Sequence, residues 1–179
     1  MKIFLTVCLL CQSFNTFSQL WVLTPEGLRD STDKRKKYVM IECKGLSSKQ
    51  LYDRALIYFT LNSRDSAKQI RIKWDSVDII FDSFDNYLFT AEYLMHYSPV
   101  YAYYSIELRF YPDSVRCEIM DPDLVEMDSG QKLLVKGSPL SAHCIYNRHN
   151  KLLKPELKSK IEKYFNGELT NIVHYLNQQ

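Results

Sequence analysis

Two histidines and a cysteine lie close together in the last quarter of the chain, where they could bind a metal ion or perform nucleophilic catalysis. These residues are His143, Cys144 and His149. Structural zinc sites usually combine two paired-ligand clusters at stricter spacing, and this chain offers one loose cluster. Adjacent residues rarely bring their side chains into base–nucleophile contact, which argues against Cys144 acting with His143. We therefore expect no metal, no cofactor and no catalytic residue here.

A run of acidic residues could also be considered as a metal site, in this case for calcium. It consists of Asp121, Asp123, Glu126 and Asp128. The run lacks the glycine and the terminal glutamate of a calcium-binding loop, so a solvated turn is favoured. The sequence also has no phosphate-binding loop and no nucleophile elbow. Together these patterns predict a protein that is not an enzyme.

Tyrosine is unusually common, with 13 residues in the chain. A tyrosine-rich stretch runs from Tyr87 to Tyr111, and tyrosine is favoured at interfaces because it buries area and keeps a polar tip. We interpret five of these residues as a candidate contact surface for a partner: Tyr87, Tyr93, Tyr97, Tyr101 and Tyr103. The alternative is that they pack along a strand edge and over the core.

The N-terminus has the layout of a secretory signal peptide. Lys2 is followed by an apolar run from Ile3 to Leu10, and small residues precede Gln19. The run is shorter than the roughly 20 residues that cross a bilayer. We therefore expect residues 1–18 to be removed and the mature protein to be exported to the periplasm or the extracellular space. A lipid-anchored Cys8 or Cys11 is disfavoured, because neither follows a small residue.

Cleavage would leave Cys43, Cys117 and Cys144, an odd number for an exported protein. Cys43 and Cys117 both face the predicted core. They could form a disulfide if the first and last strands are neighbours. The alternative is that both are buried thiols that act as small hydrophobic residues.

Composition is that of an ordinary soluble globular protein, with 46% hydrophobic and 25% charged residues. The net charge of +2 is too balanced for a nucleic-acid-binding protein. Residues 19–37 are interpreted as an N-terminal arm whose basic cluster, 33–37, is either a solvated lead-in or a contact to an anionic surface. Residues 38–179 are expected to form a single domain without a membrane span.

Periodicity defines the elements of that domain. Alternation predicts strands at 38–44, 70–74, 77–82, 102–110 and 115–119, with a further short strand at 132–136. Ser47 and Gln50 form a capping box before a helix over 48–62, and Pro155 begins a second helix that runs to the C-terminus. A two-residue turn at 75–76 would set Lys73 opposite Asp78. Segments 83–100 and 121–150 do not predict a single structure.

These elements predict an α+β fold in the order β-α-β-β-β-β-α, with an antiparallel sheet covered on one face by both helices. The open face is then expected to carry charges of both signs: Glu42, Lys44, Arg71, Lys73, Asp78, Asp82, Glu107, Arg109, Arg116 and Glu118. Mixed signs would repel phosphates as often as attract them, so we expect no nucleic-acid binding.

The segment from Gly45 to Ala55, followed by Tyr58 and Phe59, resembles a bacterial domain-of-unknown-function family with a TATA-binding-protein-like fold. The family pairs a G-x-S-K-x-x-L-Y-x-R helix start with a later Tyr- and Ile-rich strand, which Tyr101 to Leu108 matches. Ser48 stands where the family has lysine. The resemblance implies this fold, and export from Bacteroidota-type bacteria, and it implies no activity.

The function expected from the sequence is an exported, non-enzymatic interaction module of the cell envelope. The alternative is a small-ligand or lipid-binding protein with a pocket between the helices and the sheet. A filled core with exposed tyrosines would favour the first, and an apolar cavity of at least about 300 Å³ would favour the second.

Overall fold

The computed structural model describes residues 20–62, 69–74, 76–93, 96–138 and 143–178, and the predicted signal peptide lies outside them. The central sheet has five antiparallel strands in the order β3-β7-β6-β5-β4. Their bounds are Tyr38–Glu42 for β3, Gln69–Trp74 for β4, Asp78–Tyr93 for β5, His96–Tyr111 for β6 and Ser114–Glu126 for β7. The α+β class and the antiparallel sheet are confirmed.

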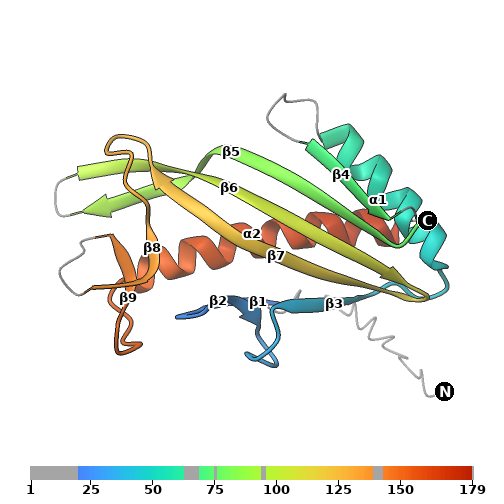
Figure 1. Cartoon of the computed structure of the whole chain (residues 1–179), viewed down its shortest axis with the longest axis horizontal. Coiled ribbons are helices and arrows are strands. Elements are labelled where there is room, and N and C mark those ends of the chain that lie inside the picture. The colour runs from blue at the N-terminus through green and yellow to red at the C-terminus, as the bar shows by residue number, and fades with distance from the viewer. Residues whose placement is uncertain (1–19, 63–68, 75, 94–95, 139–142, 179) are drawn as a thin grey trace, which may run out of the picture.

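Two helices, α1 (Ser48–Asn62) and α2 (Pro155–Asn177), pack on the same face of this sheet. From α1, Phe59 stacks on Phe81 at 4.3 Å between ring centroids. From α2, Phe165 meets Tyr104 edge-on at 5.3 Å. Phe81 and Tyr104 lie at inward positions of β5 and β6, so both helices share one hydrophobic core. Figure 1 shows α2 running along the length of the sheet.

Both helices begin where their sequence predicts. The Ser47 hydroxyl accepts the Gln50 N–H at 3.3 Å, and the Gln50 side-chain oxygen accepts the Ser47 N–H at 2.9 Å, which completes the capping box. Pro155 occupies the first turn of α2. The helix continues unbroken through Gly167, because its buried residues keep one helical stripe from Leu157 to Leu176.

The N-terminal arm is the first correction. Residues 20–30 form a hairpin of β1 (Trp21–Thr24) and β2 (Gly27–Asp30). Trp21 is fully buried, and Leu23 and Leu28 are buried beside it. The hairpin belongs to the core because its alternate apolar side chains face α2. In the following basic cluster, 33–37, residues 34–37 are exposed as the expected solvated lead-in.

The β4–β5 hairpin corrects a second expectation. Ile72 pairs with Ile79 as predicted, but a bulge then sets Trp74, and not Lys73, opposite Asp78. The bulge places Trp74 on the face of Asp78 and Arg109, which is the open face of the sheet. Trp74 is 68% exposed, and Asp78 is buried with its carboxylate 3.6 Å from the Arg109 guanidinium. Asp78 is opposite Arg109 and next to the inward Ile79, so it lies on the open face as expected, although its side chain is buried there.

The β6–β7 hairpin has the predicted register, with Phe110 opposite Val115 and Arg109 opposite Arg116. The two segments left unassigned by sequence also contain strands. Residues 83–93 and 96–101 extend β5 and β6 into one long hairpin. A small parallel pair, β8 (Leu134–Gly137) with β9 (Cys144–Asn147), covers one end of the molecule. Within the described residues, β1, β2 and β9 are additional to the predicted strands, and β8 falls on the short strand predicted at 132–136.

Candidate binding groove between α2 and β5

An open groove lies between α2 and the second half of β5, with a volume of about 590 Å³. Its origin is a large bulge in β5. Between the pairs Asp85–Ala102 and Phe89–Val100, β5 has three residues where β6 has only Tyr101. Of these extra residues, Tyr87 and Leu88 line the groove. Tyr87 through Thr90 form one wall of the groove, and a face of α2 forms the other.

The helical wall is a single face of α2. Its residues follow the spacing of a helical stripe: Lys160, Lys163, Tyr164, Gly167, Glu168 and Asn171. Gly167 is the only one of these without a side chain. A Cβ added there would meet no atom within 4 Å, so the space in front of it is open. A glycine inside a helix costs about 0.5–1 kcal/mol relative to alanine, and packing does not require this one.

A chain of hydrogen bonds joins the bulge to the helix. The Tyr164 hydroxyl donates to the Asp85 carboxylate at 2.6 Å, so the 2.9 Å bond between Tyr104 and Tyr164 uses Tyr104 as donor. Burial raises the pKa of Tyr104 to about 12. Burial, followed by the neighbouring Tyr104, also raises the pKa of Tyr164. Both phenols stay protonated at neutral pH, so they hold the groove wall in place and do not accept protons.

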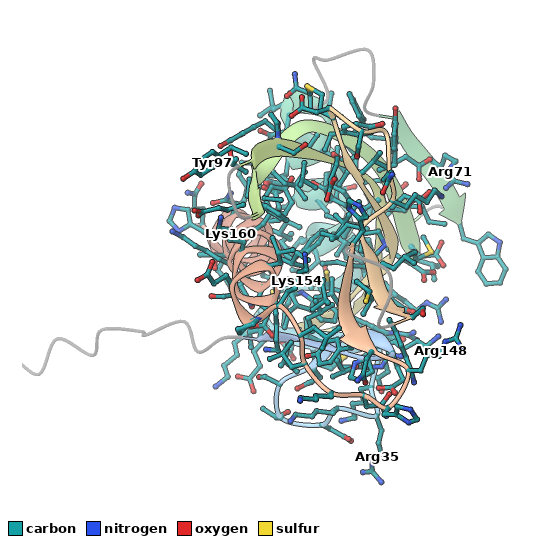
Figure 2. The ribbon with its side chains drawn as sticks, turned by 90° about the vertical axis from the view of Figure 1, so that its left-hand side faces the viewer. Arg35, Arg71, Tyr97, Arg148, Lys154 and Lys160 are labelled. Atoms are coloured by element: carbon teal, nitrogen blue, oxygen red, sulfur yellow. The ribbon has the colours of Figure 1, made fainter. Side chains whose placement is uncertain are left out.

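Lys160 on α2 also binds the β5 wall of the groove. Its Nζ donates to the backbone carbonyl of Thr90 at 2.7 Å. On the strand side, the Tyr87 hydroxyl lies 3.0 Å from the Thr90 hydroxyl oxygen. Figure 2 shows Lys160 on α2 below the β5–β6 hairpin that carries Tyr97, both on the left of the view. The groove is thus bounded by fixed polar contacts and an aromatic rim.

The five tyrosines of the predicted contact surface fall into two groups. Tyr87 is 57% exposed and borders the groove. Tyr97, Tyr101 and Tyr103 occupy alternate positions of β6 and therefore share the face away from the helices. Tyr97 is 63% exposed and donates to the Glu92 carboxylate at 3.1 Å. The side chain of Tyr93 lies outside the described residues.

Tyr101 and Tyr103 form an aromatic cluster with Phe84 on the open face. The Phe84 and Tyr103 rings stack at 4.5 Å, and Tyr101 lies edge-on to Tyr103 at 5.9 Å. A second, smaller pocket of about 370 Å³ lies beside Tyr103 and Asp82. The sequence predicted these tyrosines as a contact surface. It did not predict the bulge in β5 that separates them from Tyr87, because no residue pattern marks that bulge.

Charges on the open face are largely paired with one another. Arg71 binds Asp82 at 2.5 Å, and the Ser105 hydroxyl also donates to Asp82 at 2.5 Å. Arg116 binds Glu118 at 2.5 Å. The Arg116 guanidinium also lies 4.3 Å from the centre of the Tyr38 ring. This face therefore presents neutralised pairs of charges beside the aromatic cluster.

The cysteines considered for a disulfide are free and buried. The first and last strands of the sheet are neighbours as expected, but Cys117 pairs with Val39, four residues from Cys43. Four residues of strand span about 13 Å, and a disulfide requires Cα atoms within about 7 Å. The bridge is therefore not formed, and the two thiols pack as small hydrophobic residues.

The cluster near Cys144 is held by structural contacts. His143 Nδ1 lies 2.9 Å from the buried Glu126 carboxylate, and the Cys144 thiol donates to the Ser138 carbonyl at 3.3 Å. His149 is exposed in a turn. Among the residues that the structure describes, no group of three or more His, Cys, Asp or Glu side chains could hold a metal ion.

Comparison with solved structures identifies the fold. A DUF4468 family protein from Bacteroides ovatus superposes with a TM-score of 0.57 at 12% identity, over 79% of this chain and 85% of that chain. A TBP-like protein from Parabacteroides distasonis superposes with a TM-score of 0.52 at 9% identity, over 78% of this chain and 90% of that chain. The fold is TBP-like. The resemblance seen in the sequence is confirmed, since both neighbours come from Bacteroidota and one carries a domain-of-unknown-function name.

At this identity the TBP-like similarity defines the fold alone, because function depends on sites and not on folds. No protein-family model matches the sequence. No curated protein shows significant similarity to it. Within the described residues, neither helix is long and apolar enough to span a membrane.

Proposed function

We propose that this protein is an exported, non-enzymatic interaction module that binds a protein partner in the cell envelope. The observation that carries the proposal is the groove between α2 and β5, with exposed Tyr87 on its rim and exposed Tyr97 on the same hairpin. An exposed aromatic side chain beside a hollow, such as Tyr87, is typical of residues that dominate binding energy at interfaces. Tyr97 adds an exposed aromatic side chain on the face of the hairpin away from the helices. The helices and the sheet share one buried apolar core, and the groove lies outside it on the surface.

The chemistry of the groove supports binding rather than catalysis. Its phenols hold their protons, since burial raises the pKa values of Tyr104 and Tyr164. Lys160 is engaged with a backbone carbonyl. A hydrolase would need convergent titratable groups with complementary roles in a cleft, and the groove walls provide positioning contacts instead.

The paired charges of the open face support a partner other than nucleic acid. A nucleic-acid-binding surface is expected to present a continuous basic patch to phosphates. Here Arg71 and Arg116 are each bound to a carboxylate at 2.5 Å. A phosphate that approached either guanidinium would therefore also meet the negative charge of its carboxylate partner.

The test is capture from the envelope fraction of the native cell with the purified protein as bait. The informative variant combines Tyr87→Ala with Tyr97→Ala. The matched control combines Ile57→Ala with Leu61→Ala, two residues of α1 that are also about half exposed. We expect a protein that the wild type and the control retain and the tyrosine variant loses. Recovery of no protein partner, or equal recovery with all three baits, would contradict the proposal.

Export is tested separately. The proposal predicts that the protein is recovered outside the cytoplasm and that its N-terminal sequence begins near Gln19. Recovery in the cytoplasm with Met1 or Lys2 retained would rule out the envelope setting, whatever the groove binds.

The groove also supports a second candidate, a small-ligand or lipid-binding protein. Its volume of about 590 Å³ lies within the range of ligand sites, about 300–1,000 Å³. Native mass spectrometry of the protein purified from its own cell distinguishes the two. A bound mass of a few hundred daltons that Gly167→Leu removes would favour the small ligand.

A further inference from the structure

The second half of β5 is a free sheet edge within the described residues. β4 pairs with β5 only as far as Asp82, and beyond that point the described pairing of β5 is with β6 alone. A free edge presents unpaired N–H and C=O groups, which makes it a template for another strand. The groove lies directly along this edge, because Tyr87 to Thr90 line it.

The register shows which groups face outward. Thr90 is opposite Pro99, and proline has no N–H to donate across the ladder. The Pro99 carbonyl accepts the Met127 N–H at 2.8 Å, on the opposite side of β6. Thr90 and Pro99 are therefore a non-hydrogen-bonded pair, and the Thr90 N–H and C=O point away from β6. Glu92, two residues further, has the same orientation. The bond from Lys160 Nζ to the Thr90 carbonyl agrees with this direction.

The opposite wall suits a polypeptide with acidic side chains. Lys160 and Lys163 face the groove, and within the described residues neither forms an ion pair with a carboxylate. Glu168 contributes the single negative charge of the lining. Gly167 leaves the middle of the wall open, at a cost to helix stability that packing does not require.

We propose that the β5 edge binds an extended, acidic peptide segment of a protein partner by strand addition, with the segment lying in the groove against α2. This inference rests on the proposed function and specifies its partner. Peptide backbone groups pair with those of Thr90 and Glu92, and a peptide N–H replaces Lys160 on the Thr90 carbonyl. Lys160 and Lys163 then bind peptide carboxylates, and an apolar peptide side chain fills the space in front of Gly167.

The test is selection of a random peptide library displayed on phage against the purified protein. We expect enriched peptides to alternate apolar and polar residues, because alternate side chains of an added strand point to the same face. We also expect them to carry Asp or Glu, which can bind Lys160 and Lys163. A synthetic copy of an enriched peptide should slow hydrogen exchange at the Thr90 and Glu92 N–H groups. The same peptide N-methylated at alternate residues should lose binding, because it cannot pair with the edge.

Matched variants locate the site. Gly167→Leu fills the groove, and Ser159→Leu places the same side chain on the exposed surface of α2 outside it. Lys163→Glu reverses a groove charge, and Lys151→Glu makes the same change in an exposed turn. We expect each groove variant to raise the peptide dissociation constant about tenfold, the effect of losing one charge-assisted hydrogen bond or its equivalent. The two control variants should bind as the wild type does.

Two results would overturn the inference. One is enrichment of no peptide, in which case Lys160 only protects the β5 edge from aggregation. The other is enrichment of peptides whose binding Gly167→Leu and N-methylation leave unchanged. Either result is compatible with capture of a partner that depends on Tyr87 and Tyr97, so the proposed function would stand. Loss of that capture as well would reject both.

Discussion

Asn166 on α2 binds the backbone of Trp21 on β1 through both ends of its side-chain amide. Its Oδ1 accepts the Trp21 N–H at 2.9 Å, and its Nδ2 donates to the Trp21 carbonyl at 3.0 Å. The same Oδ1 also accepts the Leu20 N–H at 2.9 Å. The amide thus pairs with the edge of β1 as a neighbouring strand would. This contact fastens the N-terminal hairpin to α2, while the next residue, Gly167, faces the groove.

Asn166→Ala is expected to destabilise the protein by about 1–3 kcal/mol, because it leaves partly buried N–H groups of β1 without an acceptor. The measurement is urea denaturation of the variant beside Asn171→Ala, which removes an exposed amide from the same helix. Equal stability of the two variants would show that the hairpin does not depend on Asn166.

Gly167→Ala is expected to stabilise the protein by about 0.5–1 kcal/mol, because the new Cβ meets no atom within 4 Å and glycine is unfavourable inside a helix. Thermal unfolding followed by circular dichroism measures the change. A lower midpoint than that of the wild type would mean that Gly167 has a packing role, and would remove the argument that it keeps the groove open.

Alkaline pH is expected to destabilise the fold. Burial raises the pKa values of Tyr58 and Tyr104 from about 10 to about 12, so the folded state holds these protons more tightly than the unfolded state. Their contribution is complete below the unfolded pKa of about 10 and is lost as the pH rises through 12. Denaturation at a series of pH values, with Tyr104→Phe as control, measures the loss. The variant should show a shallower fall, and an identical fall would contradict the assignment to Tyr104.

The described cysteines are expected to resist alkylation in the folded protein. Burial raises the pKa of Cys117 to about 12 and also raises that of Cys43, which removes the reactive thiolate. In urea without reductant, Cys43, Cys117 and Cys144 should all be alkylated, because none of the three forms a disulfide in the structure. Mass spectrometry with and without prior reduction gives the count. A count that rises after reduction would reveal a disulfide and contradict the thiol state of these cysteines.

Elements with strict periodicity could be predicted from the sequence. The capping box at Ser47 and the register of Phe110 with Val115 are examples, because local spacing alone specifies them. The hairpin at 20–30 could not, because only four residues of each strand alternate and the apolar partner of Trp21 is α2, more than a hundred residues away.

Less of the groove than of the fold could be predicted from the sequence. Tyr87 was selected for its residue type, and it does lie on the rim. Lys160 and Tyr164 were missed because each is an ordinary residue of an amphipathic helix until the bulge in β5 brings Thr90 and Asp85 to it. The one available signal was Gly167, a glycine that interrupts neither the helix nor its apolar stripe.

The most direct test of the binding groove is photo-crosslinking in the native cell. A benzoylphenylalanine residue replaces Tyr87 on the groove rim, or Ile57 on the exposed side of α1 as control. The account predicts a discrete crosslinked protein from position 87 that position 57 does not give and that Gly167→Leu removes. The same crosslinked products from both positions, or a product at position 87 that persists in Gly167→Leu, would contradict it.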